Sequence, residues 1–136
     1  MLSLNLFGKS KLTVIVGCGR LGSTLANQLS DAGKNVILID QNAAAVRKLS
    51  PAYAGLMLTG DATDRATLNQ AELNRADHLV IVTNNDNTNI MIAQLARECF
   101  RTPQIICRLY DPQRECVYRE FGIQTLCPTR LSALAI

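Results

Sequence analysis

A chain of 136 residues, 48% hydrophobic and 18% charged, has the size and composition of one globular domain and is neither fibrous nor disordered. Its formal net charge of +3 is small, its basic residues are scattered, and its aromatic residues are three Phe and three Tyr, so a nucleic-acid surface is not indicated. No apolar run is long enough to cross a membrane, and the N-terminal MLSLNLFGKSK lacks the charge order of a secretory signal.

The five cysteines are odd in number and form no CxxC pair, which argues against a disulfide framework. They are Cys18, Cys99, Cys107, Cys116 and Cys127. With a single histidine in the chain, a metal site is not expected. We interpret the cysteines as buried, reduced thiols of a cytosolic protein.

Short apolar, β-branched runs alternate along the chain with longer segments of helical period. Six runs predict strands, over residues 12–16, 36–39, 56–58, 79–83, 105–109 and 124–127. Helices are predicted from residue 21 to a terminating glycine at 33, over residues 43–49, 65–71, 88–100 and 112–121, and from residue 131 onward. Continuous apolar runs suit strands that are covered on both faces. The pattern therefore predicts a Rossmann-like α/β fold, a doubly wound, six-stranded parallel sheet in a single domain.

A glycine-rich loop, within VIVGCGRLGSTL, joins the first predicted strand to the first predicted helix. Gly17, Gly19 and Gly22 satisfy G-x-G-x-x-G in the context that this motif requires. Gly17 would make the tight turn, Gly19 would let a pyrophosphate approach the backbone, and Gly22 would let helix and strand pack closely. The N-terminus of the helix would add free N–H groups and a partial positive charge. The alternative is a glycine turn that holds no ligand.

Two charged residues accompany this loop. Asp40 ends the second predicted strand, where its carboxylate would accept hydrogen bonds from both hydroxyls of a ribose and would repel a 2′-phosphate, which disfavours NADP. Arg20 lies in the loop itself, where it would contact a phosphate of its own subunit or of a neighbour's. Alternatively, Arg20 is a solvent-exposed residue at the start of a helix, with no ligand contact.

Polar residues follow the next two predicted strands at the same edge of the sheet. Asp61 and the backbone N–H of Ala62, after Gly60, are placed to contact an adenine edge, although a turn with a helix cap explains them as well. Thr83, Asn84, Asn85 and Asp86 end the fourth predicted strand, and their polar groups would line the same crevice.

Arg108 and His78 also need an interpretation. Arg108 lies inside an apolar strand and, if buried, needs a phosphate or a carboxylate as its partner. His78 begins the fourth predicted strand, at the edge away from the crevice, and is interpreted as structural.

No Ser/Lys, Tyr/Lys or Cys/His pair forms recognisable catalytic machinery, and the nucleotide fold uses up the chain. Binding without turnover is therefore predicted, and the protein is not expected to be an enzyme. Two other hypotheses stay open: an NAD-dependent oxidoreductase whose catalytic part lies on another chain, and a redox sensor that works through Cys18.

The stretches VIVGCGRLGSTLA, NVILID, GDATD, ADHLVIVTNNDNTNIMIAQLAR, IICRLYDP and GIQTLCPT together resemble the RCK N-lobe. This domain, also called KTN or TrkA-N, occurs in bacterial Trk and Ktr potassium-uptake regulators and in ligand-gated potassium channels. The resemblance covers residues 12–130 as the domain, with residues 1–11 as an N-terminal extension and residues 131–136 as the start of a crossover helix. The second lobe of the family is absent, so the chain is either a standalone N-lobe or a truncated one.

The resemblance implies a cytoplasmic domain that binds NAD(H), ATP, ADP or AMP and regulates potassium ion transport. Its partner would be a membrane subunit of a potassium transporter or channel, at the inner face of the membrane, with no contact to nucleic acid and no insertion into the bilayer. The implied ligand-binding residues are Gly17, Cys18, Gly19, Arg20, Leu21 and Gly22 for phosphates, Asp40 for the ribose, Asp61 and Ala62 for the adenine, and Thr83 and Asn84 on the cleft wall, with Gln41 and Gly60 also in the site. Arg20 and Arg108 match positions where relatives place cations near the terminal phosphate or across the dimer.

The resemblance also implies assembly into homodimers or rings. The broad apolar face of residues 88–100 and the helix from Pro112 would supply the contacts. Some relatives carry an acid at the position of Thr129, linked to metal or phosphate sensing, so the threonine here argues against a bound divalent ion.

Overall fold

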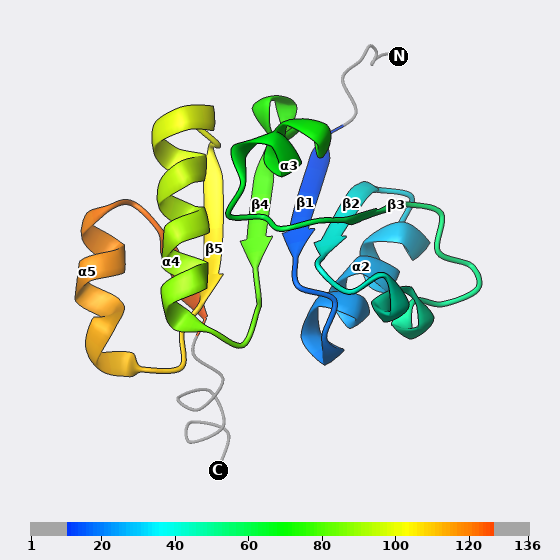
Figure 1. Ribbon diagram of the computed structural model, residues 1–136, viewed down its shortest axis with the longest axis horizontal. Helices are drawn as coiled ribbons and strands as arrows, with labels where there is room; N and C mark the ends of the chain where they lie inside the picture. The colour runs from blue at the N-terminus through cyan, green and yellow to red at the C-terminus, as the bar shows by residue number, and fades with distance from the viewer. Residues whose placement is uncertain (1–10, 127–136) are drawn as a thin grey trace.

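The computed structural model describes residues 11–126, and a six-stranded parallel sheet lies at their centre (Figure 1). The strands are β1 (Leu12–Val16), β2 (Asn35–Asp40), β3 (Leu56–Thr59), β4 (His78–Ile81), β5 (Gln104–Arg108) and β6 (Gln124–Leu126). Their order is β3-β2-β1-β4-β5-β6, so the direction of winding reverses between β1 and β4. The predicted doubly wound α/β fold is confirmed.

Helical segments connect the strands. They are α2 (Arg20–Asp31), the 3₁₀ segments η1 (Ala43–Lys48), η2 (Leu73–Arg75) and η4 (Pro112–Arg114), the α-helices α3 (Arg65–Gln70), α4 (Asp86–Leu95) and α5 (Glu115–Glu120), and the π-helical segment η3 (Ala96–Phe100) that continues α4. Figure 1 shows α2 at one end of the sheet near β2, and α4 and α5 at the other end near β5.

Alternate side chains of the inner strands enter two separate apolar layers. In β1, Val14 and Val16 pack in one layer with residues of α3, α4 and α5, whereas Ile15 packs in the other with residues of α2 and η1. Because both faces of the sheet are covered, these strands are apolar throughout, which explains the continuous runs in the sequence.

The carboxyl ends of the central strands lie level with one another. Val16 of β1 is in register with Ile39 of β2 and with Ile81 of β4, and the backbone pairing continues from the N–H of Gly17 to the carbonyl of Ile39 at 2.8 Å. The loops that leave β1, β2 and β4 therefore meet at one edge, where the winding reverses, and this is where open α/β sheets bind their ligands.

Several element boundaries differ from the predictions. The fourth strand ends at Ile81 rather than at residue 83, where the carbonyl of Thr83 accepts a hydrogen bond from the Asn89 side chain instead. The fifth strand is shifted by one residue toward the N-terminus. The helix predicted over 88–100 begins two residues earlier, because the side chain of Asn85 caps it by accepting from the N–H of Thr88 at 3.0 Å.

Two of the predicted helices have another helical form. The segment predicted over 43–49 is a 3₁₀ helix capped by Asn42, and the one predicted over 112–121 is a 3₁₀ turn followed by α5, with Asp111 as its cap. Gly33, at a φ of 77°, follows the end of α2 as predicted.

The interpretation of the cysteines as buried thiols is correct for Cys18 and Cys107 and wrong for Cys99 and Cys116. The last two lie on helical faces that are turned to water.

Within residues 11–126 no helix has both the length and the apolar character needed to cross a membrane. Cys127, Thr129, the predicted domain end at residue 130, the predicted helix at 131–136 and most of the N-terminal extension lie outside the described residues.

Candidate functional site

A cleft of about 390 Å³ lies at the carboxyl edge of the sheet, where the winding reverses. Loops after β1, β2, β3 and β4 and the first turns of α4 surround it. The lining residues are Val16, Gly17, Cys18, Gly19, Ile39, Asp40, Gln41, Asn42, Ala45, Lys48, Gly60, Asp61, Ala62, Val82, Thr83, Asn84, Asn85, Thr88, Ile92 and Arg108. Its size and its mixture of apolar walls and polar groups are those of a small-molecule site.

The three loop glycines have different surroundings. Gly17 has a φ of 107°, and a Cβ there would lie 3.0 Å from the backbone of Thr83. A Cβ at Gly22 would overlap the carbonyl oxygen of Gly17, so this glycine lets α2 approach the strand end. A Cβ at Gly19 would meet nothing within 4 Å. The fold thus requires glycine at the outer two positions, whereas the middle one borders open space in the cleft.

Asp40 joins the end of β2 to this loop. Its Oδ2 accepts a hydrogen bond from the N–H of Cys18 at 2.7 Å, and its Oδ1 accepts one from the N–H of Asn42 at 2.8 Å. An ionised carboxylate offers about four acceptor sites, so two remain for further donors. Asp40 therefore orders the loop as well as lining the cleft, a role that its position in the sequence does not reveal.

Cys18 is a wall residue whose thiol is turned away from solvent. The side chain is 1% exposed, and Sγ donates to the carbonyl of Ala45 at 3.3 Å. Burial and, next, the charge of Asp40 raise the pKa of the Cys18 thiol, while Lys48 opposes them. A buried, protonated thiol reacts slowly, which argues against the redox-sensor hypothesis.

Asp61 and Gln41 meet at the opening of the cleft. Oδ1 of Asp61 accepts from the hydroxyl and the N–H of Thr63, at 2.7 and 2.9 Å, and these bonds, together with one from the Gln41 side chain, lower the pKa of Asp61. Asp61 thus forms the turn that the alternative interpretation expected, while Gly60, Asp61 and Ala62 also line the cleft.

Asn89 is a fully buried polar residue that the sequence interpretation missed. Its Nδ2 donates to the carbonyls of Thr83 and Arg108, each at 3.1 Å, and its Oδ1 accepts from the Thr83 hydroxyl. It thereby joins the chain beyond β4 to the end of β5 beside the cleft. Helical periodicity places Asn89 on the same face as Ile92 and Ala96, which are buried. The spacing of these residues in the sequence therefore indicates that Asn89 is buried as well.

Arg108 lines the cleft, and its partners differ from the expected carboxylate. Its Nη1 donates to the carbonyl of Val82 at 3.1 Å, and its guanidinium carbon lies 5.1 Å from the centre of the Tyr110 ring. Its buried Nε finds no acceptor among residues 11–126. The phosphate that was the other expected partner stays a prediction.

Eleven of the fourteen expected residues come together around the cleft, and Arg20, Leu21 and Gly22 do not line it. Arg20 is exposed at the start of α2, and Leu21 packs against the apolar layer that contains Ile15. Lining residues that the sequence interpretation missed lie at strand ends or in the segments that follow them, and they are Val16, Ile39, Asn42, Ala45, Lys48, Val82, Thr88 and Ile92. His78 lies at the opposite end of β4, as expected.

A family model for the TrkA-N domain matches residues 13–128. The Trk system potassium uptake protein TrkA of Streptomyces coelicolor is 39% identical over 120 residues, which cover 88% of this chain and 54% of that protein. A TrkA homologue of Methanothermobacter thermautotrophicus is 36% identical over 121 residues, covering 88% and 56%. The chain thus spans about half the length of these curated relatives.

Solved structures share the fold. The TrkA-N domain of the Escherichia coli inner membrane protein YbaL has a TM-score of 0.83 at 23% identity, covering 93% of this chain and 94% of its own. The Kef C-terminal domain of Shewanella denitrificans, solved with AMP, has a TM-score of 0.80 at 23% identity and covers 92% and 76%. The GsuK channel bound to NAD has a TM-score of 0.76 at 19% identity and covers 90% and 22%. The resemblance seen in the sequence is confirmed: the chain belongs to the TrkA-N domain family.

Proposed function

We propose that this chain is a nucleotide-binding domain that regulates a potassium transport system, and that its cleft binds NAD(H) or an adenine nucleotide (ATP, ADP or AMP) without turnover. The observation that carries the proposal is the glycine loop held by Asp40 at the mouth of the cleft. A loop of this kind followed by a helix N-terminus binds phosphates, and a carboxylate at the end of β2 accepts from ribose hydroxyls. Membership of the TrkA-N family supports the link to potassium uptake.

Each part of the cleft has a proposed task. The backbone from Gly17 to Gly19, with the N-terminus of α2, would hold phosphates, and Arg20 would contact them from the rim or from a second copy of the chain. Asp40 would use its two remaining acceptor sites for the ribose, beside Gln41. The further assignments are Leu21 and Gly22 with the phosphate loop, Gly60, Asp61 and Ala62 at the adenine, and Thr83, Asn84 and Arg108 on the opposite wall.

We further propose that residues 12–130 form the domain and that it self-associates into dimers or rings through α4 and α5. Met91 of α4 and Val117 of α5 are exposed by 52% and 48%, and Phe121 just after α5 by 37%, so these helices present apolar side chains that a second copy of the chain would bury. The partner would be the membrane subunit of a potassium transporter or channel, reached from the cytoplasm at the inner face of the membrane. Pull-down with such a subunit, with and without nucleotide, tests this part separately.

Titration of the chain with a panel of nucleotides by calorimetry tests the binding. We expect AMP, ADP, ATP or NAD(H) to bind and NADP to bind much more weakly, because Asp40 would repel a 2′-phosphate. The competing hypothesis of an oxidoreductase component predicts a strong preference for NADH over ATP and AMP, together with oxidation of an added substrate in a lysate. Absence of binding across the panel would contradict the proposal.

A further inference from the structure

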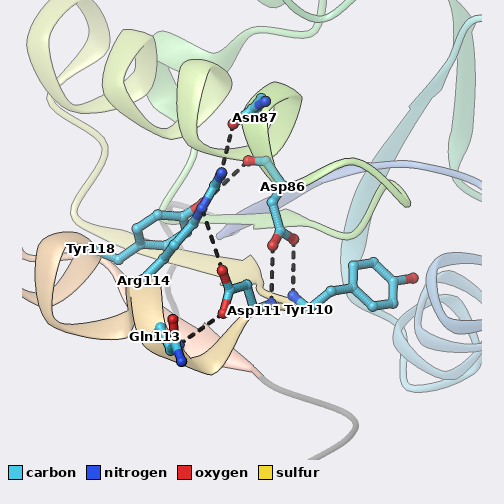
Figure 2. A network of polar contacts seen from close by, with 7 residues as sticks. All are labelled: Asp86, Asn87, Tyr110, Asp111, Gln113, Arg114 and Tyr118. Carbon is cyan, nitrogen blue, oxygen red and sulfur yellow. Dashed lines mark hydrogen bonds and ion pairs between the residues drawn. The ribbon is translucent and has the colours of Figure 1, made fainter.

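The first turns of α4 hold the chain that leaves β5 at three points. Asn89 donates to the carbonyl of Arg108 at 3.1 Å. The two carboxylate oxygens of Asp86 accept from the N–H groups of Tyr110, at 2.9 Å, and of Asp111, at 3.1 Å (Figure 2). The exit of β5 is therefore fixed to α4 beside the cleft, and a carboxylate is needed because both of its oxygens accept.

The same turn also holds α5. The Tyr118 hydroxyl donates to the carbonyl of Asp86 at 3.2 Å, and Nη1 of Arg114 donates to Oδ1 of Asn87 at 2.7 Å (Figure 2). Asp111 in turn pairs with Arg114 at 3.8 Å. These bonds anchor the segment after Tyr110 from its other side, so the backbone around Tyr110 has little freedom to move.

The orientation of Arg108 depends on this arrangement. Its guanidinium is held by the carbonyl of Val82 and by the ring of Tyr110, and its backbone is held by Asn89. A guanidinium carries five N–H donors in a fixed plane, and it binds a phosphate well only when that plane already faces the ligand. The Tyr110 ring extends from the backbone that Asp86 holds by accepting from its N–H at 2.9 Å.

We propose that Asp86 is a positioning residue for nucleotide binding. By holding the backbone of Tyr110, it keeps the ring of that residue against Arg108 and orients the guanidinium toward a phosphate group of the ligand. Asp86 is not among the described residues that line the cleft, so its effect on affinity is exerted through Arg108. This inference rests on the proposed function.

The test compares ADP with adenosine, which lacks phosphates, by calorimetry on the whole chain. In Asp86→Asn one carboxylate oxygen is replaced by an NH₂ group, so one of the two N–H groups loses its acceptor. We expect ADP affinity to fall about tenfold, while adenosine affinity changes by less than about twofold. Removal of a negative charge alone would act in the opposite direction, since ADP is an anion.

Asp77→Asn is the matched control. It also removes one carboxylate that accepts from a backbone N–H, that of Leu12 at 3.1 Å, but at the opposite edge of the sheet. Both affinities should stay at their wild-type values. If Asp86→Asn lowers the affinity for adenosine as much as the affinity for ADP, or lowers neither affinity, the inference is wrong.

A double-mutant cycle with Arg108→Gln shows whether Asp86 acts through Arg108. In the Arg108→Gln background, Asp86→Asn should not lower the affinity for ADP further. If it lowers that affinity as much as it does in the wild-type chain, the inference is overturned.

If Asp86→Asn does not fold, Tyr110→Leu replaces it, because Tyr110 is 41% exposed and the fold tolerates the loss of its ring. Tyr110→Leu should lower the affinity for ADP more than the affinity for adenosine. An unchanged ratio of the two affinities overturns the inference. A wild-type chain that binds neither ligand would instead refute the proposed function itself.

Discussion

The carboxylate of Asp40 lies 2.7 Å from the backbone N–H of Cys18 and thereby holds the glycine loop against the end of β2. The same carboxylate is the group proposed to accept from the ribose. The conformation of the glycine loop and the proposed recognition of the ribose therefore both depend on the side chain of Asp40.

Replacement of Asp40 by alanine should affect stability and binding together. The N–H groups of Cys18 and Asn42 lose their acceptor, so we expect the free energy of unfolding in urea to fall by about 1–3 kcal/mol and nucleotide affinity to fall about tenfold or more. Asp77→Ala, which removes the acceptor of the Leu12 N–H, should lower stability without lowering affinity. Equal affinities of Asp40→Ala and the wild-type chain would refute the ribose assignment.

Replacement of Asn89 by leucine should destabilise the fold strongly. The carbonyls of Thr83 and Arg108 would be left without their donor in a fully buried place, at a cost of about 2–4 kcal/mol in the free energy of unfolding. Asn69→Leu on the exposed face of α3 is the control, with an expected change within about 0.5 kcal/mol. A similar, small effect of both substitutions in urea unfolding would contradict the role given to Asn89.

Buried Cys107 should make stability depend on alkaline pH. Burial and, next, the charge of Asp86 raise the pKa of the Cys107 thiol from 9.0 to about 12. Above about pH 9 the unfolded chain loses this proton while the native chain keeps it, so the free energy of unfolding falls by about 1.4 kcal/mol per pH unit for this group.

Urea unfolding between pH 8 and 11 checks this dependence. Cys107→Ala should make the slope against pH shallower, whatever its effect on absolute stability, and exposed Cys116→Ala should leave the slope as it is. An identical slope in the wild-type chain and in Cys107→Ala would show that this thiol does not contribute.

Much of the fold could be predicted because its signals are local. The apolar runs, the three glycines and the helix-ending Gly33 each act through their own backbone geometry or periodicity, and the alternation of strands and helices leaves few topologies open. Asp40 was assigned to the cleft for the same reason, since it ends a strand at the edge where winding reverses.

The contacts that complete the cleft could not be predicted in this way. Asp86 and Asn89 bind backbone groups of β5 and of the chain that follows it, about twenty residues along the sequence. Because nearly every residue has the same backbone donor and acceptor, the residue types do not reveal these partners. The sequence left a carboxylate or a phosphate as the partner of Arg108, and it contained no sign that the carbonyl of Val82 and the ring of Tyr110 also hold the guanidinium. The expected loop residues Arg20 and Leu21 do not line the cleft, because α2 already begins at Arg20, which is exposed, and Leu21 packs against the apolar layer that contains Ile15.

Gly19→Ala shows whether the glycine loop holds the phosphates of a nucleotide. The added methyl group would meet no protein atom within 4 Å, so the fold should lose no more than about 1 kcal/mol, yet the methyl group occupies the space where a phosphate would approach the backbone. Thr24→Ala, on the exposed face of α2, is the control. In calorimetric titration with ADP and NAD, we expect the wild-type chain and Thr24→Ala to bind with a Kd below about 1 mM, and folded Gly19→Ala to lose binding. No binding by the wild-type chain, or equal binding by Gly19→Ala, would show that the loop does not hold the phosphates.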